Sequence, residues 1–482
     1  MNERANILVI FPDQWRGDSL SYLGHPVAET PFLDALAAQG TIFTQSYSNC
    51  PSCIAARACL ITGQTPGSTG RHGYRDGVPW PYSNTLMRCL RDDGYQTLMA
   101  GKTHFHPARA HLGFEQLALY DNQSVGSGRL SDYSLYLERQ TNGRVEDTAQ
   151  MLESNGVVVH PWTHDESLHA NSWTVTAAIE MLERRDPTRP FFLKLAFHRP
   201  HPPLDPPVEY LRRFEDVELP PVPVGDWVSW SDQRNWRIDL SRGVLPVRLL
   251  ERARRAYYAQ INHLDFQIGR LLRWMQLRGM ESETLVVFCS DHGEQLGEHH
   301  LFRKTTALDA SARVPLIVRL PVSWQAPHGQ RREEPVALHD IMPTLLEAAG
   351  CRIPPSVEGQ SLLPLAQGAE AVEWRRYVHL EHAGSTLGPW QAVTDGREKY
   401  IWNTQDGSEL FFDLASDPCE CHNAAADAAA ADRIDKWRRR LVTELAGYEA
   451  DGLIKDGKLN PGHSLPAARE WLLKGKESAD AH

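Results

Sequence analysis

The sequence lacks any long hydrophobic run. No stretch of its 482 residues approaches the ~20 consecutive apolar residues that a membrane-spanning helix needs. The first residues, MNERANILVIFPDQW, carry no basic region ahead of a long apolar segment, and ILVIF has the length of a buried strand rather than of a signal peptide. We therefore expect a cytoplasmic protein without a membrane partner.

Positive charge is also scarce. Lysine and arginine number 50 against 61 aspartate and glutamate residues, so the formal net charge is −11. An acidic surface argues against a general nucleic-acid-binding protein and against a protein that binds anionic membranes. An anionic substrate therefore requires a local cluster of positive groups, because the overall field of the protein repels it.

Cysteine is sparse, with eight residues in the chain, yet three of them lie in one short segment, NCPSCIAARACLITGQTP at 49–66. Disulfides are rare in a reducing cytoplasm. Cys50 and Cys53 form a C-x-x-C pair that would suit zinc, but the nearest thing to a second pair, Cys419 and Cys421, lies far along the chain. The other interpretations are ordinary core packing and one reactive cysteine among bystanders.

Apolar strands alternate with helical segments along most of the chain. NILVIFPD, PFFLKLAFHRP and TLVVFCSD are continuous apolar runs that end in polar turns, which is typical of buried central strands. Residues 253–279 place apolar side chains at helical spacing over several turns. The alternation predicts an α/β fold, with a large mixed sheet flanked by helices.

The pattern changes after about residue 368. RRYVHLEHA, WQAVTDGREKYIWN and SELFFDL are short alternating strands separated by turn signals, as in an antiparallel sheet, and a helix follows at about 430–448. We expect a main α/β domain over 1–368 and a smaller C-terminal α+β subdomain over 369–482, which carries the antiparallel sheet and an irregular tail.

Two local expectations concern the segment after the first strand. Thr30 precedes PFLDALAAQG and is expected to cap that helix, with Pro31 in its first turn. TIFTQSY, at 41–47, is expected to form one strand.

A Pro/Trp-rich insertion without periodicity occupies residues 217–247. Long ordered loops of this kind are often functional. Trp227, Trp230 and Trp236 would offer stacking faces for a sugar or a cage for a quaternary ammonium group. The alternative is that they fix an otherwise loose loop.

Carboxylates end two of the predicted strands. Asp13 is followed by Gln14, and Asp291 is followed by His292. Two carboxylates, an amide oxygen and an imidazole suit Ca²⁺, Mn²⁺ or Mg²⁺. Each aspartate alone would more simply cap the next helix. Because ligands of open α/β sheets bind at the carboxyl ends of strands, the two pairs together favour a metal site.

Lysines and histidines form a second group of candidates. Lys102 and His104 follow a predicted strand in GKTHF, His201 lies in the proline-fixed HRPHPP, and Lys304 ends GEHHLFRK. Singly, such residues are usually solvated or structural. Around a metal they would make a site for an anion, in which lysines hold charge and histidines move protons. Two neighbouring residues are weaker candidates, His299 and His300.

The second part of the cysteine-rich segment, ARACLITG, has the composition of a helix. If ARACLITG is a helix, Cys53 lies at its N-terminus and Arg57 lies one turn further on. A helix N-terminus favours anions, and Arg57 would steady the same anion or a metal-bound oxygen. Cys59 and Cys89, like Cys50, fit small buried residues.

CIAARACLITG resembles the signature of the formylglycine-dependent sulfatases, a family of the alkaline phosphatase superfamily. The segments NILVIFPDQWRGD, GYQTLMAGKTHF, FHRPHPP, TLVVFCSDHGEQLGEH, ARVPLIVRLP and HDIMPTLLEAAG are similar to blocks of that family in the same order. The resemblance extends from the N-terminus to about residue 425. It implies a sulfatase fold and the hydrolysis of a sulfate ester.

The resemblance also implies that Cys53 is oxidised to formylglycine by a maturation enzyme and that the hydrated aldehyde is the nucleophile. It implies one divalent metal ion, Ca²⁺ or Mn²⁺. The metal ligands that it implies are Asp13, Gln14, Asp291, His292 and the modified Cys53.

The remaining roles implied by the resemblance concern the sulfate group. Arg57 would stabilise the hydrate, and Lys102 and Lys304 would hold the sulfate oxygens. His201 would protonate the leaving alcohol. His104 would take the proton from the second hydroxyl, so that sulfate is expelled. The substrate would be a sulfated sugar or another small organosulfate, with aryl sulfates as surrogates, and large members of this superfamily often form homo-oligomers.

The signature departs from the usual C-x-P-S-R at Ala55 and Ala56. Gln14 and His292 are more similar to the metal site of choline sulfatases and phosphonate monoester hydrolases, whereas Lys102 together with His104 is typical of sulfatases. The alternatives are therefore a phosphonate monoester or phosphodiester hydrolase on the same scaffold, and a metal-binding protein without turnover.

Overall fold

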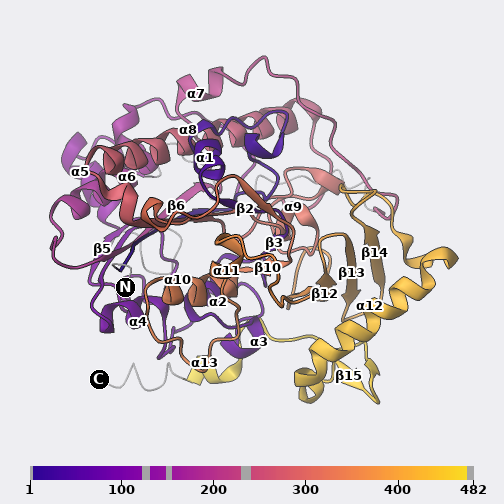
Figure 1. The fold of residues 1–482 in the computed structure, drawn as a ribbon. Helices are drawn as coiled ribbons and strands as arrows, with labels where there is room; N and C mark the ends of the chain where they lie inside the picture. Colours follow the sequence, from indigo (N-terminus) through magenta and orange to yellow (C-terminus); the bar gives the residue numbers. More distant parts are fainter. Residues whose placement is uncertain (1–3, 122–130, 148–154, 230–239, 475–482) are drawn as a thin grey trace.

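A computed structural model describes residues 4–121, 131–147, 155–229 and 240–474. Its centre is an eight-stranded sheet that confirms the predicted α/β class (Figure 1). Five neighbouring strands run parallel, and β8 is antiparallel to both of its neighbours, so the sheet is mixed. The strand order across the sheet is β5 (Gln116–Leu119), β4 (Gln96–Gly101), β6 (Phe191–Pro200), β1 (Asn6–Asp13), β7 (Thr284–Cys289), β8 (Leu316–Arg319), β2 (Thr41–Phe43) and β9 (Gln330–Arg332).

Helices cover both faces of this sheet (Figure 1). Alternate residues of β1 serve the two faces: Ile7 and Val9 pack into one core, and Leu8 and Ile10 into the other. One face carries α1 (Pro31–Ala38), α6 (Ala170–Glu183) and α8 (Val247–Leu277). The other face carries α2 (Cys53–Thr62), α4 (Leu86–Asp92), α10 (Ile341–Ala348) and α11 (Leu363–Ala366).

Further helices of the main body lie beside or between these elements. They are α3 (Pro66–Thr69), α5 (Asp132–Thr141), α7 (Val208–Arg212) and α9 (Asp309–Ala312). Within the described residues, no helix combines the length and the hydropathy that crossing a membrane would require.

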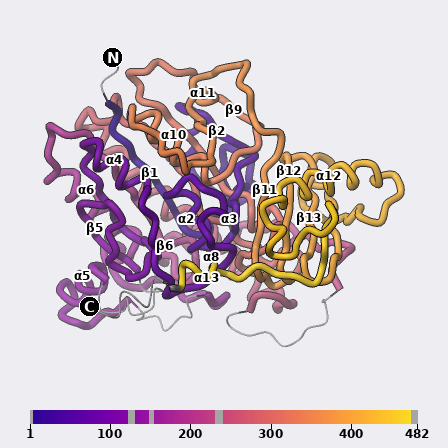
Figure 2. Tube along the Cα trace, turned by 90° about the horizontal axis from the view of Figure 1, so that it is seen from below, coloured from indigo at the N-terminus to yellow at the C-terminus, as the bar shows by residue number. Residues whose placement is uncertain are grey.

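The C-terminal antiparallel sheet lies beside the main body (Figures 1 and 2). Its strands follow chain order and are β11 (Val378–His382), β12 (Trp390–Thr394), β13 (Glu398–Asn403) and β14 (Glu409–Asp413). Helix α12 (Ala431–Glu444), which lies within the predicted helix at about 430–448, packs on one face of the sheet through Trp437. The domain division at residue 368 stays a prediction.

The tail after α12 returns to the main body. A small hairpin, β15 (Ile454–Lys455) with β16 (Lys458–Leu459), precedes helix α13 (Glu470–Lys474). The N–H of Arg469 donates to the carbonyl of Gly70 beside α3, at 2.8 Å. The position of α13 below the main sheet is visible in Figure 1. The irregular tail therefore connects the C-terminal sheet back to the main body beside α3.

Two local predictions, the Thr30 cap and the single strand at 41–47, are wrong. The Thr30 side chain makes no capping bond to α1, because Oγ1 donates instead to Asp34. The free N–H groups of Phe32 and Leu33 are accepted by the carboxylate of Asp265, which comes from α8, at 3.0 and 2.8 Å. A distant side chain thus replaces the local cap.

The segment 41–47 forms two strands rather than one. β2 ends at Phe43, and β3 (Ser46–Tyr47) pairs with β10 (Val336–Ala337) in a separate two-stranded sheet. The chain leaves the large sheet at Thr44, whose N–H bonds to the carbonyl of Arg332. This change of sheet directs the chain toward α2.

Candidate active site

Four adjacent strands deliver polar side chains to one edge of the main sheet. β4, β6, β1 and β7 are parallel neighbours, and they are followed by or end at Lys102, His201, Asp13 and Asp291 respectively. Since the carboxyl ends of parallel strands lie at the same edge, residues far apart in the sequence meet there. The N–H of His201 donates to the carbonyl of Asp13 at 3.1 Å, which fixes two of these strand ends against each other.

Cys53 is the first residue of α2, and its side chain points into this group. Every residue of α2 is buried. The Cys53 Sγ lies 3.1 Å from His292 Nε2 and 3.8 Å from Asp13 Oδ1. Burial and the charge of Asp13 raise the pKa of this thiol, but Lys304 and His292 outweigh them, so its pKa falls below the ordinary value. The cysteine is therefore a buried thiol at the centre of a charged site.

Arg57 lies one helical turn after Cys53 and bonds both carboxylates. Its Nη2 lies 3.0 Å from Asp13 Oδ2 and 3.0 Å from Asp291 Oδ2, and its Nη1 donates to the carbonyl of Lys102 at 3.0 Å. The guanidinium is fully buried. Burial disfavours ionised Asp13, yet Lys102, His201, Arg57 and His292 together hold the pKa of Asp13 well below its usual value. Arg57 thus holds both carboxylates in place.

The other oxygens of these carboxylates face a common point. Asp13 Oδ1 and Asp291 Oδ1 lie 3.6 and 3.7 Å from His292 Nε2. Ligand atoms of Asp13, Cys53, Asp291 and His292 all fall within 4.8 Å of one another. His292 Nδ1 lies 2.9 Å from the carbonyl of Gly293, which leaves Nε2 as the free nitrogen toward the cluster. This donor set, rich in oxygen with one imidazole, fits a divalent cation such as Ca²⁺ or Mn²⁺.

Gln14 lies beside this cluster in a left-handed backbone conformation, with φ at 71°. Its N–H donates to Asp291 Oδ1 at 3.0 Å. Its amide nitrogen bonds to Glu294, and its Oε1 accepts from Lys304 Nζ at 2.8 Å. Gln14 therefore connects Asp291, through its backbone, with Lys304, through its amide oxygen.

The two predicted lysines lie on different sides of the site. Lys102 Nζ lies 2.8 Å from Asp13 Oδ2 and is fully buried. Lys304 Nζ lies 2.8 Å from His201 Nε2 as well as from Gln14. His201 Nδ1 lies 2.8 Å from the carbonyl of Pro202, so Nε2 is the nitrogen directed at the site. Burial and the Lys304 charge hold the pKa of His201 well below its ordinary value.

His104 is buried at 1% exposure. Neither ring nitrogen has a hydrogen-bond partner among the residues that the structure describes. Its backbone is left-handed, with φ at 59°, and its N–H donates to Asp121 at 2.7 Å. Burial and the charges of Lys102 and Arg57 hold the pKa of the imidazole well below its ordinary value. A buried imidazole without a partner is typical of a group whose partner arrives with a ligand.

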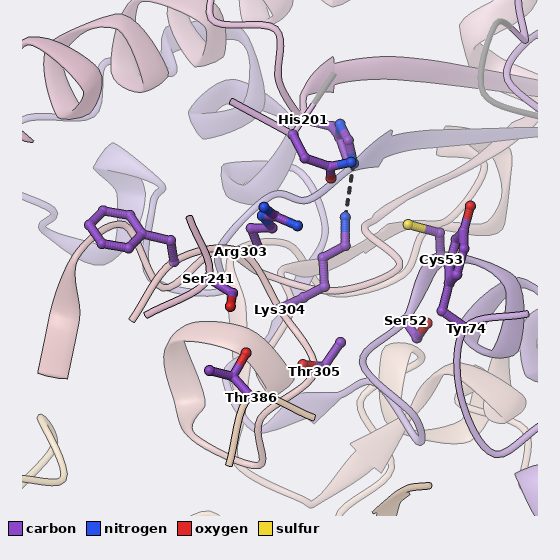
Figure 3. Close-up of a pocket in the computed structure, with 11 residues that line it drawn as sticks. Ser52, Cys53, Tyr74, His201, Ser241, Arg303, Lys304, Thr305 and Thr386 are labelled. Carbon is purple, nitrogen blue, oxygen red and sulfur yellow. Dashed lines mark hydrogen bonds between the residues drawn. The ribbon is translucent and has the colours of Figure 1, made fainter. Parts of the chain in front are cut away.

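Above these residues opens a cavity of about 440 Å³ (Figure 3). Cys53 and Tyr74 lie on one side of it, and Lys304 with Arg303 lies on the other. The ring of Tyr74 makes an edge contact with the ring of His104, with centroids 5.9 Å apart, and Tyr74 is 48% exposed. The cavity therefore leads from solvent to the thiol. It is lined by Ser52, Cys53, Tyr74, Asn155, His201, Ser241, Phe302, Arg303, Lys304, Thr305 and Thr386.

Sequence reasoning missed several residues of this cavity. Tyr74 and Ser241 carry no motif, and Thr386 comes from the loop that follows β11 in the C-terminal sheet. Trp390 of β12 donates from Nε1 to the carbonyl of Thr305 at 2.8 Å and so fixes the loop that carries Lys304. Ser52, Arg303 and Thr305 had a signal in the sequence, because each is adjacent to a predicted site residue.

Of the insertion 217–247, the structure describes Trp227, whereas Trp230 and Trp236 lie outside the described residues. The Trp227 ring packs on His299, with centroids 4.9 Å apart, and Nε1 donates to the carbonyl of Glu420 at 2.8 Å. Trp227 therefore fixes its loop. His299 accepts the N–H of Gly225, and neither it nor His300 lines the cavity.

All eight cysteines are free thiols. Cys50 and Cys59 are fully buried, Cys89 is half-buried, and burial raises the pKa of each of these thiols. Within the described chain the cluster that suits a metal includes Cys53 and excludes Cys50, so the C-x-x-C zinc interpretation has no geometric support.

Together the fold and this site define a hydrolase of the alkaline phosphatase superfamily. A model of the sulfatase family matches residues 5–351, and a model described as N-sulphoglucosamine sulphohydrolase, C-terminal, matches residues 297–446. The chain belongs to the sulfatase family. It is a sulfuric ester hydrolase.

Two curated relatives span nearly the whole chain. It is 39% identical to an arylsulfatase of Clostridium perfringens, over 96% of this chain and 98% of the relative. It is 31% identical to a choline-sulfatase of Rhizobium meliloti, over 88% of this chain and 82% of the relative.

Solved structures share the fold at lower identity. The phosphonate monoester hydrolase of Agrobacterium radiobacter superposes with a TM-score of 0.78 at 24% identity, over 92% of this chain and 96% of that one. A protein solved with its substrate D-glucosamine-2-N,6-O-disulfate superposes with a TM-score of 0.73 at 20% identity, over 93% and 99%. At these identities the likeness shows the fold alone.

Proposed function

We propose that this enzyme hydrolyses the sulfate ester of a small organic or sugar alcohol through a formylglycine made from Cys53 and one divalent metal ion. The observation that carries the proposal is the placement of Cys53. Its side chain leaves the first turn of a buried helix and lies 3.1 Å from His292 Nε2, inside the oxygen-rich cluster and facing the cavity.

The metal, Ca²⁺ or Mn²⁺, would be held by Asp13, Asp291, His292 and the modified Cys53, with Gln14 beside them. It supplies positive charge that offsets the charge of the transferring sulfate. Arg57 holds both carboxylates in place by ion pairs, and Lys102 pairs with Asp13. The short bond from Lys304 to Gln14 Oε1 supports a role for Gln14 at the border of the metal and sulfate sites.

Formylglycine formation removes two electrons from the Cys53 side chain, and water then replaces its sulfur, which leaves as sulfide. The oxidant is supplied through a maturation enzyme that reads the segment around Cys53. Once formed at Cys53, the hydrated aldehyde would supply a nucleophilic oxygen and a second hydroxyl.

Three side chains of this protein then act on substrate. Lys304 donates to a sulfate oxygen. His201 gives a proton from Nε2 to the ester oxygen as the alcohol leaves. His104, whose neutral imidazole has no described partner, takes the proton from the second hydroxyl. Both histidines are buried and close to cations, as a site for an anion requires.

The second candidate is a phosphonate monoester or phosphodiester hydrolase. Gln14 and His292 favour it, whereas the presence of both Lys102 and His104 at the site favours sulfate. The expected result is a higher kcat/KM for 4-nitrophenyl sulfate than for 4-nitrophenyl phenylphosphonate. The reverse order would replace the sulfate assignment by the phosphonate one.

The first experiment is the mass of tryptic peptide 17–57 from protein co-produced with a maturation enzyme. A peptide mass that corresponds to formylglycine at Cys53 would support the proposed nucleophile. It would also show that the maturation enzyme accepts Ala55 and Ala56 in the signature. An unmodified thiol, in a protein that binds Ca²⁺ or Mn²⁺ without turnover, would instead support a non-catalytic metal-binding protein. A cytoplasmic location remains part of the proposal and is tested by cell fractionation.

A further inference from the structure

Strand β6 has a bulge at the edge of the sheet where the site lies. Between the last two paired positions, β1 advances by one residue, from Pro12 to Asp13, whereas β6 advances by three, from Phe197 to Pro200. The first extra residue of β6 is His198. A bulge redirects side chains and is over-represented next to active sites. The bulge therefore places His198 beside the strand end that carries Asp13.

The residue that follows His198 fixes the orientation of its ring. Arg199 Nη1 donates to His198 Nδ1. The same guanidinium is held by Asp205, whose two oxygens accept from it at 2.7 Å each. All of these side chains are buried. Because a guanidinium has only donors, Nδ1 of His198 is the acceptor in this bond.

This bond also decides which nitrogen of His198 carries a hydrogen. Burial and the charge of Lys102 hold the pKa of His198 well below its ordinary value, so the ring is neutral. A neutral imidazole that accepts at Nδ1 has its hydrogen on Nε2. Nε2 of His198 is therefore a hydrogen-bond donor.

That donor has no acceptor within the part of the chain that the structure describes. His198 is 2% exposed, and nothing there accepts a hydrogen bond from its Nε2. A buried donor without an acceptor destabilises a fold, and such groups are rare in native proteins. The ion pair of Arg199 with Asp205 nevertheless keeps the ring in this orientation. A donor that is held in place without an acceptor is the expected state of a group whose acceptor arrives with a ligand.

The groups around His198 are those that the proposed mechanism assigns to the sulfate ester. Its ring lies 4.9 Å from the ring of His201, centroid to centroid. The N–H of Lys102 donates to the carbonyl of Ala196 at 2.9 Å, so the ends of the paired strands β4 and β6 are adjacent. His198 therefore lies between the strand ends that carry Lys102 and Asp13.

The neighbouring protein groups do not supply the acceptor. The ammonium of Lys102 has only donors. Asp13 Oδ2 already accepts from Arg57 and Lys102, at 3.0 and 2.8 Å. Asp13 Oδ1 faces His292, at 3.6 Å from its Nε2. An oxygen of the bound ester is the remaining acceptor.

We infer that His198 is a further substrate-binding residue and that its Nε2 donates a hydrogen bond to a sulfate oxygen on the side of Lys102. This inference rests on the proposed sulfatase activity and adds a residue to its site. A group that only donates favours an oxygen without a proton, as every terminal oxygen of a sulfate ester is at neutral pH. A neutral donor also holds that oxygen without adding another charge to a fully buried cluster.

The test compares two side chains of similar length and shape in place of His198. Glutamine carries an N–H donor that reaches the position of Nε2, whereas methionine carries none. Both remove the acceptor for Arg199, so the difference between them isolates the donor. In calcium-loaded enzyme, with rates expressed per formylglycine, His198→Met should lower kcat/KM for 4-nitrophenyl sulfate about 10- to 100-fold, the range of a hydrogen bond to a charged group. His198→Gln should retain most of the wild-type value.

Inorganic sulfate provides a second readout, because it contains the accepting oxygens and no leaving group. Its competitive inhibition constant should rise by a similar factor in His198→Met and less in His198→Gln. His379 is the control position: it is half-buried in β11, and its Nε2 lies 2.8 Å from Gln391 Oε1 on the next strand of the C-terminal sheet. His379→Gln and His379→Met should have equal kcat/KM and equal inhibition constants.

Equal kcat/KM in His198→Gln and His198→Met, whether both are lowered or both unchanged, would overturn the inference, because a histidine with a merely structural role predicts no difference that follows the donor. If the wild type releases sulfate from no ester, the proposed function itself fails. Calorimetric binding of inorganic sulfate to the same calcium-loaded proteins then decides the inference separately. No binding by the wild type, or equal affinities of the two His198 variants, would refute it there as well.

Discussion

The ammonium of Lys304 lies 2.8 Å from Nε2 of His201, the one ring nitrogen of that histidine that faces the cavity. In this arrangement Nε2 accepts a hydrogen bond and carries no proton. A sulfate group that accepts from Lys304 would break this bond and leave Nε2 able to hold a proton beside a negative charge. Substrate binding would therefore allow His201 to hold the proton that it donates as the general acid.

Replacing His201 by Asn should affect esters in proportion to the basicity of their alcohol. For an alkyl or sugar sulfate, kcat/KM should fall about 10²- to 10⁴-fold, because the alkoxide cannot leave without a proton. For 4-nitrophenyl sulfate the fall should be much smaller. Steady-state rates on the two esters check this, and equal losses on both would remove His201 from the role of general acid.

Replacing His104 by Asn should separate the two halves of turnover. If His104 takes the proton that allows sulfate to be expelled, its loss leaves the first half intact. Stopped-flow assays with 4-nitrophenyl sulfate should then show a burst of about one equivalent of nitrophenol per site and a slow steady rate. Wild-type enzyme is the control, and a variant without a burst would place His104 before the first chemical step.

Chelation of the metal should abolish activity without unfolding the protein. Arg57 bonds one oxygen of Asp13 and one of Asp291, and Lys102 bonds Asp13, so both carboxylates remain paired when no ion is bound. Circular dichroism should be unchanged in EDTA, and activity should return with Ca²⁺ or Mn²⁺. In Arg57→Gln the same treatment should cost about 3–5 kcal/mol of unfolding free energy, because buried carboxylates lose their partner. Unfolding of the chelated wild type would contradict this account.

The loop that carries His201 is held by a second buried ion pair. Arg199 donates to both oxygens of Asp205 at 2.7 Å. Burial raises the pKa of Asp205, but Arg199 outweighs it and holds this pKa below the ordinary value. A lowered pKa means that the pair stabilises the fold above about pH 4 and that this contribution declines as the pH falls further. Asp205→Asn should lose about 3–5 kcal/mol at pH 7, since it leaves Arg199 buried and unpaired.

Urea titrations at pH 7 and at pH 3 check the Asp205 prediction. The difference between wild type and Asp205→Asn should shrink at the lower pH. Glu180→Gln, which breaks an exposed pair with Arg184 on α6, should show no measurable difference at either pH. A gap between wild type and Asp205→Asn that does not change with pH would mean that packing, rather than charge, accounts for the loss.

Much of the candidate site could be predicted from the sequence, because its polar residues directly follow the ends of strands. The apolar runs before Asp13 and Asp291 identify central strands, and polar residues directly after such strands meet at one edge of a sheet. Cys53 and Arg57 are separated by one helical turn, so a helix of ordinary geometry places both on the side that faces the carboxylates.

Predictions from local sequence patterns were wrong or incomplete where the hydrogen-bond partner came from a distant segment of the chain. Thr30 has the side chain of a cap, yet Asp265 of α8 takes the first N–H groups of α1. Thr386 lines the cavity from the loop after β11, and Trp390 of β12 donates to the carbonyl of Thr305. No spacing in the chain encodes such contacts, because they depend on how α8 and the C-terminal sheet pack against the main sheet.

The sequence by itself determined the α/β class, and it singled out Cys53 and the charged residues at the strand ends as candidates. Hydrophobic periodicity and short motifs are local properties of the sequence, so they can be recognised without knowledge of the tertiary packing. The tertiary structure alone decided that Gln14 accepts a hydrogen bond from Lys304, that His201 accepts from Lys304, and that Tyr74 and Thr386 line the same cavity as Cys53. These relations set the charge around the substrate, and charge interactions depend on distances in space that no position in the sequence specifies.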